Sequence, residues 1–281
     1  MSTIKQLKEM LEEESALKLV TEAYSEVAGT KLKKIRVDIE QTRVFFGEIS
    51  KVLSQIKKVA KINGIELEEK KKETAYILIT SNYRFYGSLE NNLIEYFLEN
   101  TNTDSSARFL IGKTAADFFS RANGLPSDHH TIFSTDVPTY EELKVLITAI
   151  QPYKKIVVFY PRFRSVLIQI PTKLDITQTP SDDSEDPSPS FSFIFEPELD
   201  RILKFFDNQI ISVLLQQVFL EAELARTGAR LISMEEAQSK ADRSISDQTL
   251  VLRQAVRSLK NSYLLETISA LSNWRKVSDR V

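Results

Sequence analysis

The sequence predicts an α+β protein in which long N-terminal and C-terminal helices form an antiparallel coiled coil, with a small α/β domain inserted between them. All nine prolines lie between Pro126 and Pro197, which leaves both ends without the residue that most reliably breaks a helix. Both ends also show apolar residues at alternating spacings of three and four, which is typical of coiled coils. The middle alternates strand-like and helix-like segments, which indicates a small mixed sheet.

The N-terminal helix is expected to run from about residue 3 to residue 62 and to end at Asn63-Gly64. At about 1.5 Å per residue it would be on the order of 90 Å long, longer than a small globular domain is wide. Its predicted seam starts at one apolar stripe, changes winding locally at Lys31 and Ile35, and then continues. The stripe before the change is Leu17, Val20, Tyr24 and Val27, and the one after it is Ile39, Thr42, Phe46, Ile49, Leu53, Ile56 and Ala60.

The C-terminal helix is expected to cover residues 198–275. Its predicted seam consists of Ile210, Val213, Gln217, Leu220 and Leu224, followed after Gly228 by Ile245, Thr249, Leu252, Val256, Leu259 and Tyr263. Neither helix has the apolar density of an independent core, so each needs a partner. We expect them to pair antiparallel, because the domain between them can return the chain to its starting point.

The sequence therefore predicts three parts: residues 1–73, 74–197 and 198–281. In the middle part we expect strands at 75–80, 108–111, 155–160, 166–170 and 191–195, and helices at 91–98, 114–121 and 139–150. Residues 179–190 are acidic and rich in Pro and Ser, a composition that predicts a disordered loop.

Composition excludes several function classes. The formal net charge is -2, so nothing favours nucleic acid as a partner. The absence of cysteine excludes disulfides and thiolate metal sites, and two histidines cannot form a three-histidine zinc site. No apolar run approaches the roughly 20 residues of a membrane span, so we expect no direct membrane insertion.

Three candidate chemical sites have simpler explanations. Gly112-Lys113-Thr114 resembles the end of a P-loop, but Ala107 stands where that motif needs a glycine, which favours a plain strand-to-helix turn. Asp128-His129-His130 is flanked by turn residues, which indicates a loop and no metal site. The acidic residues Glu196, Glu198 and Asp200 suit the start of a helix, where negative charge is favoured. We therefore expect no catalytic, cofactor-binding or metal-binding residues.

Ordered motifs along almost the whole chain resemble the gamma subunit family of F-type rotary ATP synthases. Residues 20–32 follow the family's Ile-Thr-x-Ala-Met-x-x-Val-Ala-x-Ser-Lys-Leu, with Tyr24 in place of Met. Residues 80–92 follow Thr-Ser-Asp-x-Gly-Leu-x-Gly-Gly-Leu-Asn-x-Asn, and residues 111–119 are similar to Gly-Arg-Lys-Gly-x-Asp-Phe-Phe. Residues 160–163, 169–171 and 195–197 match shorter motifs, and residues 221–237 resemble Glu-x-x-Ala-Arg-x-x-Ala-Met-x-x-Ala.

The chain also departs from this family. Of the C-terminal signature Ile-Thr-x-Glu-x-x-Glu-x-x-x-Gly-Ala, only Glu266 is present in residues 260–271. Arg84 replaces a family glycine, and the acidic loop at 179–190 is similar to an insertion. These departures indicate a divergent member, or the shaft of a paralogous F-like ATPase with another output.

The resemblance implies a central rotor shaft that couples ATP synthesis or hydrolysis to ion transport and has no catalytic site of its own. It implies as partners the alpha- and beta-type ring subunits of the catalytic head, an epsilon-like small subunit and a membrane-embedded c-type ring. It further implies a peripheral location on the cytoplasmic side of a membrane, with an organelle matrix or stroma as alternatives. The residues that the resemblance places against the catalytic head are Tyr24, Arg230, Arg257 and Asn261, and the apolar face of Trp274 suggests a fifth.

Two alternatives use the same observations. A non-rotary, homodimeric coiled-coil scaffold would explain the seams but not the ordered middle motifs. An independent enzyme would have to place its active site in the α/β domain.

Overall fold

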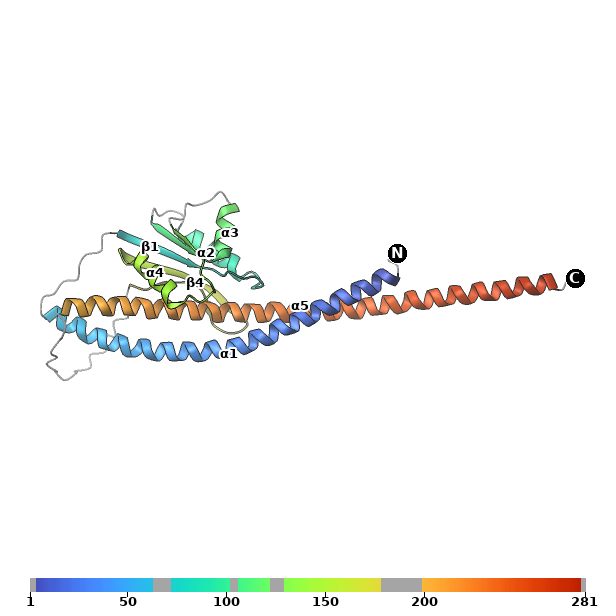
Figure 1. Ribbon diagram of the computed structural model, residues 1–281, viewed down its shortest axis with the longest axis horizontal. Helices are drawn as coiled ribbons and strands as arrows, with labels where there is room; N and C mark the ends of the chain where they lie inside the picture. Colours follow the sequence, from blue (N-terminus) through green and yellow to red (C-terminus); the bar gives the residue numbers. More distant parts are fainter. Residues whose placement is uncertain (1–3, 63–71, 102–105, 122–128, 178–198, 279–281) are drawn as a thin grey trace. The chain divides into compact units, whose positions relative to one another are not determined.

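The structure, a computed structural model, describes residues 4–62, 72–101, 106–121, 129–177 and 199–278 (Figure 1). Its elements are α1 (Ile4–Ile62), β1 (Lys72–Ile79), α2 (Leu89–Thr101), β2 (Ala107–Ile111), α3 (Lys113–Arg121), β3 (His129–Thr131), α4 (Tyr140–Ile150), β4 (Tyr153–Phe163), β5 (Gln169–Asp175) and α5 (Leu199–Ser278). The predicted loop at 179–190 and strand at 191–195 lie outside the described residues. The predicted fold class, two long helices with a small α/β domain between them in the chain, is confirmed.

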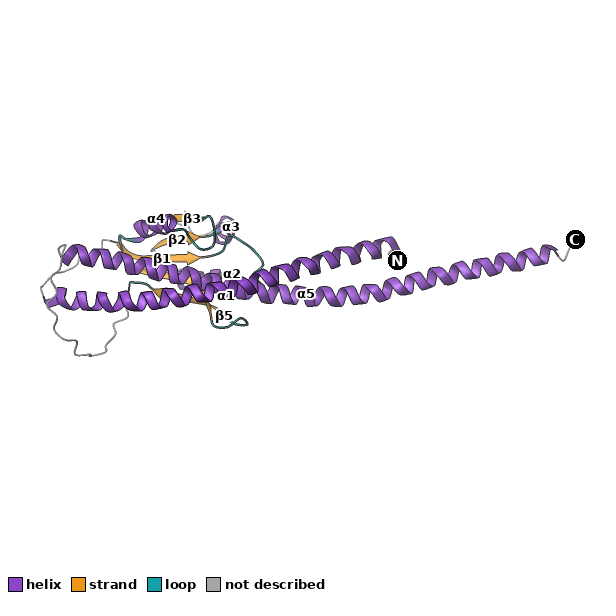
Figure 2. Cartoon of the chain, turned by 60° about the horizontal axis from the view of Figure 1, so that its bottom comes forward, coloured by secondary structure: helices purple, strands orange, loops and turns teal. Residues whose placement is uncertain are grey.

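The five strands form one sheet in the order β3-β2-β1-β4-β5. Figure 2 colours the strands orange. The strands β1 to β4 pair in parallel, and β5 closes the sheet as an antiparallel edge strand. Parallel strands are joined by crossover helices, so both faces of such a sheet are covered. This explains why β1 reads as a continuous apolar run, Ala75 to Ile79, in place of an alternating one.

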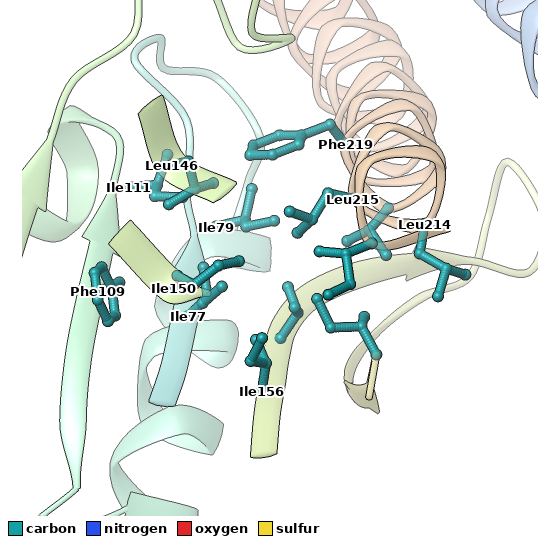
Figure 3. Packing of buried hydrophobic residues seen from close by; sticks show 14 of the residues in the cluster. Ile77, Ile79, Phe109, Ile111, Leu146, Ile150, Ile156, Leu214, Leu215 and Phe219 are labelled. Carbon is teal, nitrogen blue, oxygen red and sulfur yellow. The ribbon is translucent and has the colours of Figure 1, made fainter. Parts of the chain in front are cut away.

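Helices cover both faces of the sheet. Ile77 and Ile79 of β1 belong to a core with α4 and α5, and Figure 3 shows Leu214, Leu215 and Phe219 of α5 directed toward this face. Leu78 points to the opposite face, where the side chains of α2 and α3 form a second core. Side chains alternate between the two faces along a strand, so alternate residues of β1 pack against α5 and the residues between them pack against α2.

The chain divides into two compact units: unit 1 comprises residues 1–27 and 233–281, and unit 2 comprises residues 28–232. In unit 1, α1 and α5 run antiparallel and are joined by polar side chains. Lys18 Nζ lies 2.7 Å from Asp242 Oδ1, and Gln238 and Gln248 donate hydrogen bonds to Glu22 and Glu14 at 3.1 and 2.8 Å. Rising numbers on α1 match falling numbers on α5, as antiparallel pairing requires.

In unit 2, α1 packs on α5 through apolar side chains. Leu32, Ile35 and Ile39 of α1 form a buried cluster with Leu220 and Leu224 of α5. Further along, Phe46 and Ile49 pack against the core that α5 shares with the sheet. Of the predicted seam of α5, Leu220 and Leu224 pack on α1, whereas Ile210 belongs to the core that α5 shares with the sheet. The end of that predicted seam is wrong, because Leu259 and Tyr263 are 56% and 71% exposed.

The predicted seam at the start of α1 is wrong. Its four members, Leu17, Val20, Tyr24 and Val27, are 43–63% exposed. A series of buried or half-buried side chains with an unbroken spacing of three and four runs along α1, without a change of winding: Ile4, Leu7, Leu11, Glu14, Lys18, Thr21, Ser25, Ala28, Leu32, Ile35, Ile39, Thr42, Phe46 and Ile49. The other half-buried residues of α1 stand next to members of this series: Glu22, Gly29, Asp38, Gly47 and Ser50. The true seam in unit 1 includes charged and hydroxyl side chains, which a search for apolar residues passes over.

Two strand predictions also need correction. His129 and His130 lie on β3, which pairs with Phe109 and Leu110 of β2, and not in a loop. β5 starts at Gln169 and not at Val166, because residues 165–168 form a turn closed by hydrogen bonds between Ser165 and Ile168. The predicted division at residues 73/74 and 197/198 stays a proposal about folding units.

The corrected register makes a direct prediction about stability. Ile39 is 5% exposed in the cluster with Leu220 and Leu224, whereas Val37 on the same helix is 56% exposed. We expect Ile39→Ala to lower the free energy of unfolding by about 2–4 kcal/mol, because it removes buried methyl groups and leaves a cavity. The matched Val37→Ala change should alter it by about 0.5 kcal/mol or less. Chemical denaturation measures both, and equal losses would contradict the register.

Candidate functional site: a buried ionic cluster beneath Arg230

The predicted head-contact residues do not form one site. Arg230 belongs to unit 2, whereas Tyr24, Arg257 and Asn261 belong to unit 1 and are exposed. The side chain of Trp274 lies outside the described residues. Their roles as contacts stay predictions, and Arg230 is the member whose surroundings the structure describes in most detail.

Arg230 is held on the ring of Tyr86, in the turn between β1 and α2. Its guanidinium carbon lies 4.6 Å from the ring centroid, and one nitrogen donates a 2.6 Å hydrogen bond to the Tyr86 hydroxyl. A guanidinium on an aromatic face gains electrostatic attraction from the ring as well as contact area. The turn itself is strained, because Phe85 adopts a left-handed backbone with φ of 73°.

Asp136 holds this turn in place through hydrogen bonds. One of its carboxylate oxygens accepts a hydrogen bond from the backbone of Asn82 at 2.7 Å, and the other accepts from the hydroxyls of Ser81 and Tyr86 at 2.5 and 3.2 Å. Asp136 precedes α4, where Thr139 and Glu142 form a capping box. Hydrogen bonds from the backbone of Thr139 and Ser134 lower the pKa of Glu142, so its ionised form fixes the segment that carries Asp136.

Arg226 lies at the centre of the cluster and is fully buried. Its guanidinium nitrogens lie 3.5 Å from Glu223, 3.6 Å from Asp136 and 3.9 Å from Glu90. These distances describe ion pairs, and none is short enough for a hydrogen bond. Burial by itself would lower the pKa of Arg226, but the three carboxylates together raise it, so the residue is a permanent buried cation.

One further charge, Lys31, completes the cluster, and burial affects the pKa of two of its acidic groups. Lys31 of α1 forms an ion pair with Glu223, which links the first long helix to the group. Burial raises the pKa of Glu90 to about 7, although Arg226 opposes this shift, and Asp136 adds to it. Burial likewise raises the pKa of Tyr86, with Asp136 as the second cause, so its hydroxyl remains protonated.

Sequence reasoning missed this cluster and placed Arg226 only within a motif. A usable signal was present: three charged residues, Glu221, Glu223 and Arg226, stand in a run that is otherwise apolar or small. A helix without a polar face is buried all round, so charges on it must be paired. The partners Glu90 and Asp136 could not be found this way, because the fold alone brings them to α5.

The P-loop-like turn has a structural role, as expected. Gly112 has φ of 99°, and a Cβ there would lie 2.3 Å from the Thr80 carbonyl oxygen, so only glycine fits. The neighbouring polar groups are used internally: the Lys113 amide donates to the Asn82 side chain, and the Thr114 hydroxyl donates to the Ser81 carbonyl. In the described part of the chain, no three His, Cys, Asp or Glu residues are arranged to hold a metal ion.

Unit 1 offers a second kind of surface. Every residue from Arg257 to Leu271 on α5 is exposed, and the apolar residues among them include Tyr263, Leu264 and Ile268 at 60–71%. The stripe of Leu17, Val20, Tyr24 and Val27 on α1 is exposed as well. Contiguous exposed apolar side chains on a soluble surface mark sites of protein contact. Among the helices that the structure describes, none is long and apolar enough to cross a membrane.

These features define a class of protein: an antiparallel pair of long helices that carries an α/β domain on a buried ionic cluster and exposes apolar side chains for partners. The family model described as ATP synthase matches residues 3–271, so the chain belongs to the ATP synthase family. Within that family it is a gamma-type subunit, the central shaft of a rotary ATP synthase.

Curated relatives and solved structures agree with this assignment. The ATP synthase gamma chain of Brevibacillus brevis is 23% identical over 265 residues, covering 90% of this chain and 92% of that protein. The gamma chain of Geobacter sp. strain M21 is 24% identical over 285 residues, covering 96% and 98%. The rotor of the Euglena gracilis mitochondrial ATP synthase has a similar fold, with a TM-score of 0.64 at 15% identity, covering 91% of this chain and 98% of that one. The central stalk of the Tetrahymena thermophila enzyme gives 0.58 at 16%, covering 78% and 99%.

The geometry of the cluster predicts that removal of the Arg226 charge lowers the free energy of unfolding. Arg226→Met keeps most of the side-chain volume but leaves three acidic side chains without their shared cation in the interior. We expect the free energy of unfolding to fall by about 3–5 kcal/mol, the usual effect of breaking a buried ion pair on one side. Arg253→Met, at an exposed position of α5, is the matched control and should change it by about 0.5 kcal/mol or less. Equal effects of the two changes in a denaturant titration would refute a structural role for the cluster.

Proposed function

We propose that this chain turns inside a ring of alpha- and beta-type subunits, above a membrane-embedded c-type ring and beside an epsilon-like small subunit. The observation that carries the proposal is the exposed apolar surface of unit 1, on both of its helices, in a chain of the gamma family. Apolar contact suits a bearing, because a surface that slides must not form ion pairs that have to be broken at each step.

Rotation would act on the ring through shape and charge and not through chemistry. A pair of helices presents different side chains to successive ring subunits, so each orientation favours a different conformation of the subunit it faces. In this proposal the chain contributes no catalytic residue, and ATP is bound and converted in the ring. Tyr24, Arg230, Arg257, Asn261 and Trp274 would be the contacts with the ring.

Arg230 would be the contact with the most defined geometry. Its guanidinium is half-buried and held on Tyr86, which restricts the directions in which it can reach an acidic partner. A positioned guanidinium loses less entropy on pairing than a free one. The chain would remain peripheral, on the cytoplasmic side of its membrane or the equivalent side in an organelle, and its membrane attachment would be through protein.

Co-purification tests the assignment of partners. We expect the tagged chain to isolate two types of nucleotide-binding ring subunit in a three-to-three ratio, together with a small subunit and the c-type ring. Recovery without any nucleotide-binding ring would contradict the proposal. Recovery of ring subunits that differ from the housekeeping set would identify the alternative, a paralogous machine, to which the departures at 260–271 first pointed.

The rate of ATP hydrolysis, measured beside complex assembly, distinguishes a residue that contacts the ring from one that only supports assembly. Arg230→Glu reverses the charge of the positioned contact, so we expect ATP hydrolysis by the assembled complex to fall by about tenfold or more, since a lost charged pair costs about 1.5–3 kcal/mol. Assembly should change little, because the apolar surface of unit 1 is intact. Deletion of residues 275–281 is the comparison and should leave both assembly and turnover near their original values. The reverse ranking of the two variants would show that the contacts that matter lie at the C-terminal end.

A further inference from the structure

We propose that Glu90 holds a proton in mildly acidic solution and releases it near neutral pH, and that this proton controls how firmly the turn between β1 and α2 is held to α5. The inference rests first on the count of charges. Arg226 and Lys31 are the two cations that pair with the cluster, and Glu90, Asp136 and Glu223 are its three carboxyl groups. With all groups ionised, one negative charge is unpaired in a buried place, where an isolated carboxylate is strongly disfavoured.

The surroundings of the three carboxyl groups show which of them takes up a proton most easily. Asp136 accepts hydrogen bonds from Asn82, Ser81 and Tyr86, and it also faces Arg226. Glu223 pairs with both Lys31 and Arg226. Both ionised forms are therefore well stabilised by donors and cations.

Glu90 is the least supported of the three. One of its oxygens accepts a long hydrogen bond of 3.4 Å from the Ser81 amide, and the other has no hydrogen-bond partner among the described residues. Its nearest cation, Arg226, lies 3.9 Å away and is shared with two other carboxylates. Charge neutrality is reached most easily when Glu90 is the group that takes up a proton.

Groups from every packed element contribute to this balance. Lys31 faces the cluster from α1, Tyr86 from the β1–α2 turn and Asp136 from the segment before α4, while α5 supplies Glu223 and Arg226. Arg230 of α5 is held by the Tyr86 hydroxyl and the Arg84 carbonyl, and among the described residues it forms no ion pair with the three carboxyl groups. Burial raises the pKa of Glu90 to about 7 against the lowering effect of Arg226, in agreement with the count of charges.

Release of the proton would loosen the turn. An ionised Glu90 repels Asp136, and Asp136 is the group that holds Ser81, Asn82 and Tyr86 in place. Tyr86 donates a hydrogen bond to Asp136 and accepts one from Arg230. A shift of Asp136 away from an ionised Glu90 would therefore also change the position of Arg230. Any effect of this change on the contact between Arg230 and the ring rests on the proposed function, whereas proton binding by Glu90 is a property of the chain alone.

The experiment measures the unfolding equilibrium of the full-length chain between pH 4.5 and pH 8. The folded pKa of Glu90 lies above the unfolded value of 4.5, so its stabilising effect is complete below pH 4.5 and is lost as the pH rises through about 7. The wild-type unfolding equilibrium constant should therefore increase over this range by on the order of a hundredfold more than that of Glu90→Gln, which is neutral at every pH. Amide exchange at Asn82 should accelerate over the same range in the wild type, after correction for intrinsic exchange.

Glu95→Gln is the matched control, because Glu95 is exposed on the same helix. It should keep the wild-type pH dependence. An identical pH dependence in wild type and Glu90→Gln would overturn the proposal. Infrared titration of the wild-type chain with labelled glutamate gives a second reading that does not depend on a variant: a protonated glutamic acid band should persist at pH 6, and its absence would also overturn it. Because both readings use the isolated chain, failure here would leave the shaft function intact.

Discussion

Residues 218–229 of α5 are buried on every side, and this constraint determines much of unit 2. The segment lies between α1 and the sheet, so it has no face left for solvent. Its residues must therefore be apolar, small or paired. Ala222, Ala225, Gly228 and Ala229 are glycine or alanine, and a Cβ on Gly228 would come within 3.2 Å of Gln169 and Phe163.

The charged residues of this segment show how pairing follows from burial. Glu221 accepts a hydrogen bond from Tyr160 and faces Arg162 at 3.6 Å, both on β4. Glu223 is paired with Lys31 of α1, and Arg226 is paired with Glu90 of α2 and with Asp136 in the segment before α4. A buried ion pair adds little to stability compared with apolar packing, but it specifies which elements meet, because a wrong neighbour would leave a charge unpaired. In this way α5 carries both the coiled-coil contact and the attachment of the α/β domain.

The sequence predicted the elements whose signals are local and long. Proline placement identified both helices to within a few residues, and apolar runs located β1, β2 and β4.

The sequence-based predictions failed where the structure of a segment depends on the segment that it contacts. The stripe of Leu17, Val20, Tyr24 and Val27 has the spacing of a seam, yet Glu14, Lys18 and Thr21 occupy the seam because α5 offers Asp242 and Gln248 opposite them. The three-residue strand β3 has too few residues for a pattern, and it exists because β2 provides an edge. Motif resemblance drew attention to Arg230, but the cluster beneath it depends on Glu90 and Asp136, which only the fold brings to Arg226.

The proposed function requires a shaft that combines a rigid attachment with a sliding surface, and the two units differ in the way that this proposal requires. Unit 2 is held by buried charges and apolar cores, whereas unit 1 is joined by polar pairs and exposes its apolar side chains. The most direct measurement of this account is single-molecule observation of the assembled complex, with the ring fixed and a probe attached to an exposed position of α3. The account predicts ATP-driven rotation of the probe in three equal steps per turn, in one direction. A complex that hydrolyses ATP at a normal rate while the probe stays stationary would contradict it.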